Sequence, residues 1–146
     1  MDKLRFLIGG ELVAGDQTMT VINPATEEPV TTEAPRASVA QMNAAVAAAK
    51  AAFPRWAALP MAERRALLHK VADRIDAHAD EIGRLLTLEQ GKPLMFAIGE
   101  VKNMANDIRQ MSNLELPVKV IEDSPARRVE QHRRPLGVVA AIIPWN

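Results

Sequence analysis

The chain of 146 residues contains no cysteine. Without thiols it can form neither a disulfide nor a cysteine-ligated metal site, and it has no thiol nucleophile of its own. Its three histidines, His69, His78 and His132, lie far apart, and no His-Glu-x-x-His motif occurs. We therefore expect no metal site in this chain.

An excess of charge of one sign is also lacking. The 18 basic and 18 acidic residues give a net charge of zero, so no strong field attracts nucleic acid or an anionic membrane. The one basic cluster, Arg127, Arg128, Arg133 and Arg134, is interrupted by Glu130. We therefore expect no nucleic-acid partner.

Long apolar runs are absent too. No uncharged run approaches the length of a transmembrane helix, and the first residues lack the apolar segment of a signal peptide. These features predict no membrane partner and a cytoplasmic location. The length is that of one domain.

Short segments with strand character open the chain. Residues 4–8 and 11–13 flank Gly9-Gly10, a pair typical of a two-residue hairpin turn that needs positive φ. Residues 21–22 and 30–32 predict a second pair of strands.

Helical patterns follow. Ser38 with Gln41 three residues later is a capping-box signature, which predicts a helix start. Pro54 and Pro60 are expected to bound a short linker that holds Trp56. The apolar residues after the cap fall at spacings of three and four, as on one face of a helix: Val39, Met42, Val46, Ala49 and Phe53.

Proline and glycine mark the limits of the next helices. Pro60 suits a first helical turn, a break is expected near Ala77-His78, and Gly91 is placed to end the helix that follows. A further helix is expected from about Leu94 to Leu114. Beyond it, residues 118–123 are ambiguous.

The last two segments differ sharply in polarity. Residues 128–134 are strongly polar and predict an exposed or edge strand. Residues 138–143 are continuously apolar, as in a strand buried on both faces of a parallel sheet. Because ligands of open α/β sheets bind beyond the carboxyl ends of strands, a site is expected at Pro144, Trp145 and Asn146.

Three motifs occur in order along the chain. They are Val21-Ile-Asn-Pro-Ala-Thr26, Leu88-Glu-Gln-Gly-Lys-Pro-Leu94, and Gly137-Val-Val-Ala-Ala-Ile-Ile-Pro-Trp-Asn146 with its preceding His132-Arg-Arg-Pro-Leu136. Together they resemble signatures of the aldehyde dehydrogenase superfamily. The resemblance implies an α/β fold: an N-terminal β-meander, helices, and the first strand of a Rossmann-like dinucleotide-binding domain. Residues 1–146 would be the N-terminal part of that domain, with an oligomerisation-arm strand at about 127–135.

The resemblance also implies an activity. The family oxidises aldehydes to carboxylic acids with NAD or NADP through a thiohemiacetal, and its members are soluble homodimers or homotetramers. Asn146 would donate a hydrogen bond to the developing oxyanion. Ile142, Ile143, Pro144 and Trp145 would wall the nicotinamide site. Plain core packing explains Ile142 almost equally well, and Asn146 could instead cap the strand.

The family's nucleophilic cysteine, general-base glutamate motif and glycine-rich cofactor turn are missing from this sequence. The chain thus resembles an N-terminal portion of such an enzyme, and we expect it to be inactive alone. The alternative is a non-catalytic assembly module derived from the family, which pairs through its polar strand.

Overall fold

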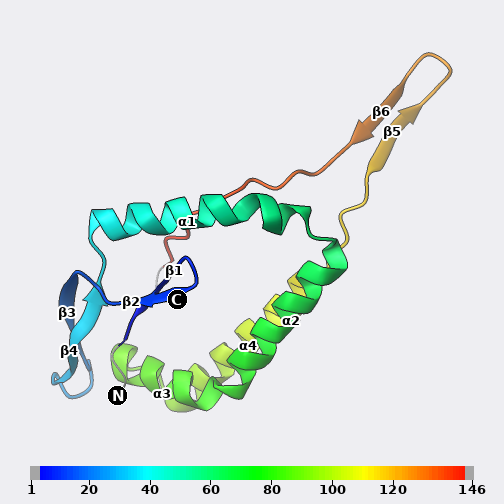
Figure 1. Ribbon diagram of the computed structural model, residues 1–146. Helices are drawn as coiled ribbons and strands as arrows, with labels where there is room; N and C mark the ends of the chain where they lie inside the picture. The colour runs from blue at the N-terminus through cyan, green and yellow to red at the C-terminus, as the bar shows by residue number, and fades with distance from the viewer. Residues whose placement is uncertain (1–3, 144–146) are drawn as a thin grey trace.

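The computed structural model describes residues 4–143, and within them the order is four strands, four helices and two strands. The strands are β1 (Phe6–Ile8), β2 (Glu11–Val13), β3 (Gln17–Ile22), β4 (Pro29–Arg36), β5 (Lys119–Asp123) and β6 (Arg128–Gln131). The helices are α1 (Val39–Ala58), α2 (Met61–Ala77), α3 (Ala79–Gln90) and α4 (Leu94–Ser112). Figure 1 shows α2, α3 and α4 as one group, α1 apart from them, and β5–β6 projecting away.

The first hairpin is confirmed. β1 and β2 pair antiparallel with Ile8 opposite Glu11, so the turn consists of Gly9 and Gly10. Their φ angles of 62° and 91° lie in the left-handed region, which glycine adopts without steric cost. The second predicted pair is confirmed as β3 and β4.

The four strands of the expected β-meander are present, and they are divided between two separate two-stranded sheets, β1–β2 and β3–β4. The connection between them is held by a side chain instead of a neighbouring strand. The Gln41 amide donates to the Ala14 carbonyl at 2.7 Å, and its oxygen accepts from the Asp16 backbone N–H at 2.9 Å. The Ser38 hydroxyl donates to the Asp16 carboxylate. These bonds satisfy the Ala14 carbonyl and the Asp16 N–H, which lie between β2 and β3.

Helix α1 begins as predicted but ends later. Ser38 accepts from the Gln41 N–H at 3.2 Å, and the Gln41 side chain accepts from the Ser38 N–H, so the capping box is complete. The linker expected between Pro54 and Pro60 is wrong, since the helix runs through Pro54 to Ala58. A single proline removes only one backbone donor. The helix ends at Ala58, because the proline that follows Leu59 disfavours the helical conformation at Leu59.

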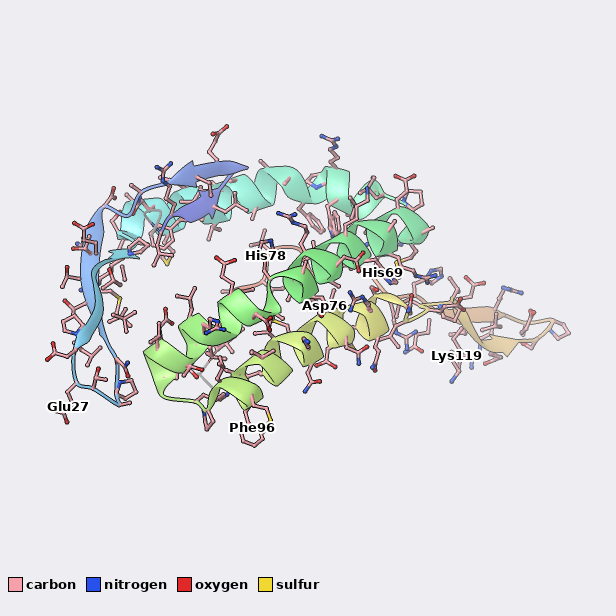
Figure 2. The ribbon with its side chains drawn as sticks, turned by 90° about the horizontal axis from the view of Figure 1, so that it is seen from below. Glu27, His69, Asp76, His78, Phe96 and Lys119 are labelled. Atoms are coloured by element: carbon pink, nitrogen blue, oxygen red, sulfur yellow. The ribbon has the colours of Figure 1, made fainter. Side chains whose placement is uncertain are left out.

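Helix α4 lies alongside both α2 and α3 (Figure 2). The predicted break near His78 and the glycine end at Gly91, with φ of 74°, are confirmed. Arg109 of α4 donates to the Asp73 carboxylate of α2 at 2.8 Å. The contact surface between these helices is built from small side chains, which let the backbones approach closely: Ala72, Ala79, Gly83, Ala97, Val101 and Ala105 are buried.

The core is small for the length of the chain. No large side chain among the described residues is fully buried, and the accessible surface is 11537 Å². A compact monomer of 16.0 kDa exposes about 7,400 Å². The apolar stripe of α1 contributes to the difference, since Val39 is 71% and Met42 55% exposed. The predicted stripe lies on a helix, and none of its residues is buried by the described part of the chain.

The buried strand predicted at 138–143 is wrong for this structure. These residues join none of the sheets in the described range, and Ile142 is 97% exposed. A strand needs a neighbour that offers backbone donors and acceptors, and no described strand lies in register beside this segment. An apolar sequence alone does not supply such a neighbouring strand.

The polar strand is confirmed as β6, which pairs with β5 from the ambiguous segment. All four residues of β6 are exposed, as expected for a strand outside the core. Its bounds, Arg128–Gln131, are narrower than the 128–134 predicted.

Two glycines of the helical group offer a matched test of its packing. Alanine at Gly83 would place its methyl group 2.6 Å from Ile98 Cγ1 and 2.9 Å from Ile98 N. We expect Gly83→Ala to lower the free energy of unfolding by about 1–3 kcal/mol. At Gly99 nothing lies within 4 Å, so Gly99→Ala should raise it by about 0.5–1 kcal/mol. Urea unfolding followed by circular dichroism measures both, and equal effects would contradict the close approach of α3 and α4.

Candidate functional site

The site predicted at the end of the chain falls mostly outside the described residues. Pro144, Trp145 and Asn146 lie beyond them, so the structure gives no position for the expected oxyanion donor. Ile142 and Ile143 are described, and both side chains are exposed. The structure therefore brings no catalytic group to these two isoleucines.

Two of the three sequence motifs meet in space. The Cβ of an alanine at Gly91 would lie 3.0 Å from Cγ of Pro24, which belongs to the first motif. Gly91 ends α3 in the left-handed conformation, and its N–H donates to the Thr87 carbonyl at 2.8 Å. Glycine is needed here both for the backbone angle and for the contact with Pro24. These motifs thus organise the fold at the end of α3.

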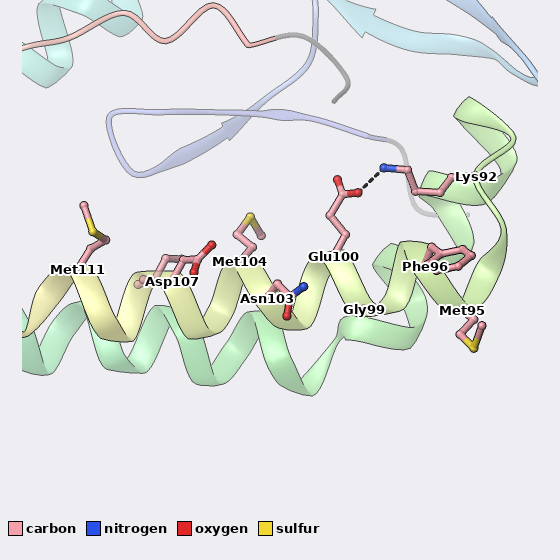
Figure 3. A pocket seen from close by; sticks show the side chains of 10 residues that line it. Lys92, Met95, Phe96, Gly99, Glu100, Asn103, Met104, Asp107 and Met111 are labelled. Atoms are coloured by element: carbon pink, nitrogen blue, oxygen red, sulfur yellow. Dashed lines mark hydrogen bonds and ion pairs between the residues drawn. The ribbon is translucent and has the colours of Figure 1, made fainter.

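An open groove runs along α4, on a side turned away from α2 and α3 (Figure 3). Methionines Met95, Met104 and Met111 give it an apolar lining, and Lys92 pairs with Glu100 at one end. Its lining contains no histidine, cysteine, serine or threonine, and its one lysine is held in the ion pair with Glu100, so the groove is better suited to packing against apolar groups than to catalysis. The three-and-four spacing along α4 predicted a helix, but nothing in the sequence marked this face as a groove.

The hairpin β5–β6 carries a network of ion pairs. Arg127 donates to the Glu122 carboxylate at 2.8 Å, and this hydrogen bond lowers the pKa of Glu122 below its ordinary value. The pKa of Glu130 is lowered by hydrogen bonds from Arg128, at 2.8 Å, and from His132. Glu122 is half-buried and the other groups are exposed to solvent, so their charges support the hairpin without forming a buried site.

Metal ligands do not gather in the part of the chain that the structure describes: no group of three or more acidic or histidine side chains could hold an ion. Among the same residues, no helix is long and apolar enough to cross a membrane.

Comparison with known proteins decides the family. The family model described as the aldehyde dehydrogenase family matches residues 12–146. The chain belongs to the aldehyde dehydrogenase family. The resemblance carried by the three motifs is thereby confirmed, and the aldehyde dehydrogenase match includes all of them.

Individual relatives agree. The chain is 42% identical over 139 residues to a probable aldehyde dehydrogenase of Pseudomonas sp, covering 95% of this chain and 28% of the relative. It is 34% identical over 149 residues to the NADP/NAD-dependent aldehyde dehydrogenase PuuC of Escherichia coli (strain K12), covering 97% of this chain and 30% of that protein.

Solved structures agree as well. A crystal structure of an aldehyde dehydrogenase from Brucella melitensis biovar abortus 2308 matches with a TM-score of 0.80 and 33% identity, over 88% of this chain and 27% of that one. The chain therefore has the α/β fold of an aldehyde dehydrogenase in incomplete form. It spans less than a third of the length of the relatives named here.

The hairpin network predicts a dependence on pH. Because hydrogen bonds hold the pKa values of Glu122 and Glu130 below the ordinary glutamate value, their pairs with Arg127 and Arg128 stabilise β5–β6 while both carboxylates are ionised. This stabilisation is lost as the pH falls through the folded-state pKa values. We expect the NMR shifts of Val120 and Val129 to move toward unfolded values on acidification.

The variant Glu122→Gln/Glu130→Gln serves as the control for this titration. It removes these two carboxylates at nearly constant shape, so the acid-dependent shifts of Val120 and Val129 should be smaller than in the unmodified chain. An unchanged acid transition in this variant would refute the assignment to these carboxylates.

Proposed function

We propose that this chain is the N-terminal part of an NAD- or NADP-dependent aldehyde dehydrogenase, which oxidises an aldehyde to a carboxylic acid. The observation that carries the proposal is the family match over residues 12–146, which includes Pro144, Trp145 and Asn146. The nucleophilic thiol cannot come from these residues, since they contain no cysteine. It must be supplied by further residues of a longer chain, so the 146 residues alone should show no turnover.

The proposed role of Asn146 is to bind the substrate oxygen. When a thiolate attacks an aldehyde carbon, the carbonyl oxygen becomes negative, and a side-chain amide can donate a hydrogen bond to it. The bound dinucleotide would accept the hydride that leaves this carbon. Ile142, Ile143, Pro144 and Trp145 are proposed to wall the cofactor. The exposed side chains of Ile142 and Ile143 support this role, because they present apolar surface that a flat ring can cover.

Assembly and location are part of the same proposal. We propose a cytoplasmic homodimer or homotetramer, with the strand at about 127–135 in the assembling arm. The exposed residues of β6 support this, because an edge strand offers free backbone groups to another chain. Sedimentation of the full-length protein should give two or four chains per particle, and a monomer at all concentrations would contradict it. Recovery of the protein with membranes after cell fractionation would contradict the location.

The direct test is Asn146→Ala in the full-length protein. Loss of one oxyanion donor should lower kcat by about 10²–10³-fold, measured as aldehyde-dependent reduction of NAD or NADP. The matched control is Asn106→Ala, since Asn106 is an exposed residue of α4. Equal activities of the two variants would refute the role of Asn146. Absence of cofactor reduction by the unmodified enzyme with every aldehyde class would refute the proposed function itself.

A further inference from the structure

A second pocket lies where four segments of the chain meet. It is lined by Trp56 near the end of α1, by the first two turns of α2, by the end of α4 with the coil after it, and by residues 133–135. Four of its lining residues are arginines, and none is acidic: Arg64, Arg65, Arg133 and Arg134. We call the whole pocket, with its apolar lining residues, the arginine pocket.

The basic cluster of the sequence is thus divided in the structure. Arg127 and Arg128 pair with acidic residues of the β5–β6 hairpin. Arg133 and Arg134 leave the hairpin and join the two arginines of α2. No acidic side chain in the described range forms a salt bridge with any of the four arginines of the pocket. Their mutual repulsion is therefore uncompensated by ion pairs within residues 4–143.

Hydrogen bonding leaves one donor of the pocket without an acceptor. Arg65 uses its Nε to donate to the Ser112 carbonyl at 3.2 Å, which positions its guanidinium beside the end of α4. Nε of Arg64 is buried and has no hydrogen-bond partner among the described residues. A buried donor without an acceptor costs free energy that an arriving anion would recover.

The start of α2 adds positive potential. Pro60 precedes the helix and provides no side-chain hydrogen bond to its first turn. The free N–H groups and the dipole of a helix N-terminus favour an anion. Glu63, the one acidic residue of this turn, does not line the pocket.

We propose that the arginine pocket binds an oxyanion, a carboxylate or phosphate group attached to an apolar body. Arginine forks match the two oxygens of such a group. Trp56, Met61 and Leu68 line the same pocket and would contact the apolar body. The group could belong to a small molecule or to an acidic side chain of the longer protein. The proposal does not depend on aldehyde oxidation.

Calorimetric titration of the full-length protein with inorganic phosphate tests the proposal. We expect saturable binding, weakened about tenfold or more by Arg133→Gln and by Arg64→Gln, because each loses a charged hydrogen bond. Arg133→Lys keeps the charge without the fork and should bind with intermediate strength. The control is Arg84→Gln, an exposed arginine of α3 outside the pocket, which should bind as the unmodified protein does.

The thermal midpoint of the same proteins distinguishes the two sources of the group. If an acidic side chain of the protein fills the pocket, phosphate will not bind. Arg133→Gln will then lower Tm more than Arg84→Gln, by a difference that shrinks as salt screens the charges. Phosphate binding that survives both glutamine variants would overturn the proposal. So would absent phosphate binding together with equal Tm values for Arg133→Gln and Arg84→Gln.

Discussion

The packing of α4 against α2 and α3 is the contact on which the rest of this structure depends. It is made by small residues, with Ala72, Gly83, Ala97 and Ala105 allowing the helices to approach closely. Such a surface is specific in shape but buries little apolar area, which limits the hydrophobic stabilisation it can provide. The large apolar side chains of α1, of the α4 groove and of residues 138–143 remain exposed. This combination fits an aldehyde dehydrogenase fold in incomplete form, since the described residues leave these faces uncovered.

Local signals in the sequence predicted local structure well. Gly9-Gly10, the Ser38 capping box, the His78 break and Gly91 each act within a few residues, and the structure has all four. The failures involve interactions across the chain. The first four strands divide into two sheets, and Gln41 bonds to Ala14 and Asp16 in the connection between them, 25 or more residues earlier. The final strand is missing because its sequence can specify an apolar segment but cannot provide the neighbour that a ladder needs.

In the candidate site, too, local sequence motifs could be recognised, whereas contacts between distant segments could not. Pro144, Trp145 and Asn146 were predicted from a motif that lies within the family match, and their positions lie outside the described residues. The arginine pocket joins Arg64 to Arg133, and no periodicity or spacing links residues so far apart. The contact of Pro24 with Gly91 joins two motifs that the sequence shows only as separate signatures.

Hydrogen–deuterium exchange on the 146-residue chain and on the full-length protein tests the central claim most directly. If the helical group α2–α4 is self-contained and the other faces await cover, amides of α4 will be protected in both proteins. Amides of α1 and of residues 138–143 will be protected only in the full-length protein. Equal protection of α1 and residues 138–143 in the two proteins would contradict the claim that this chain leaves them uncovered.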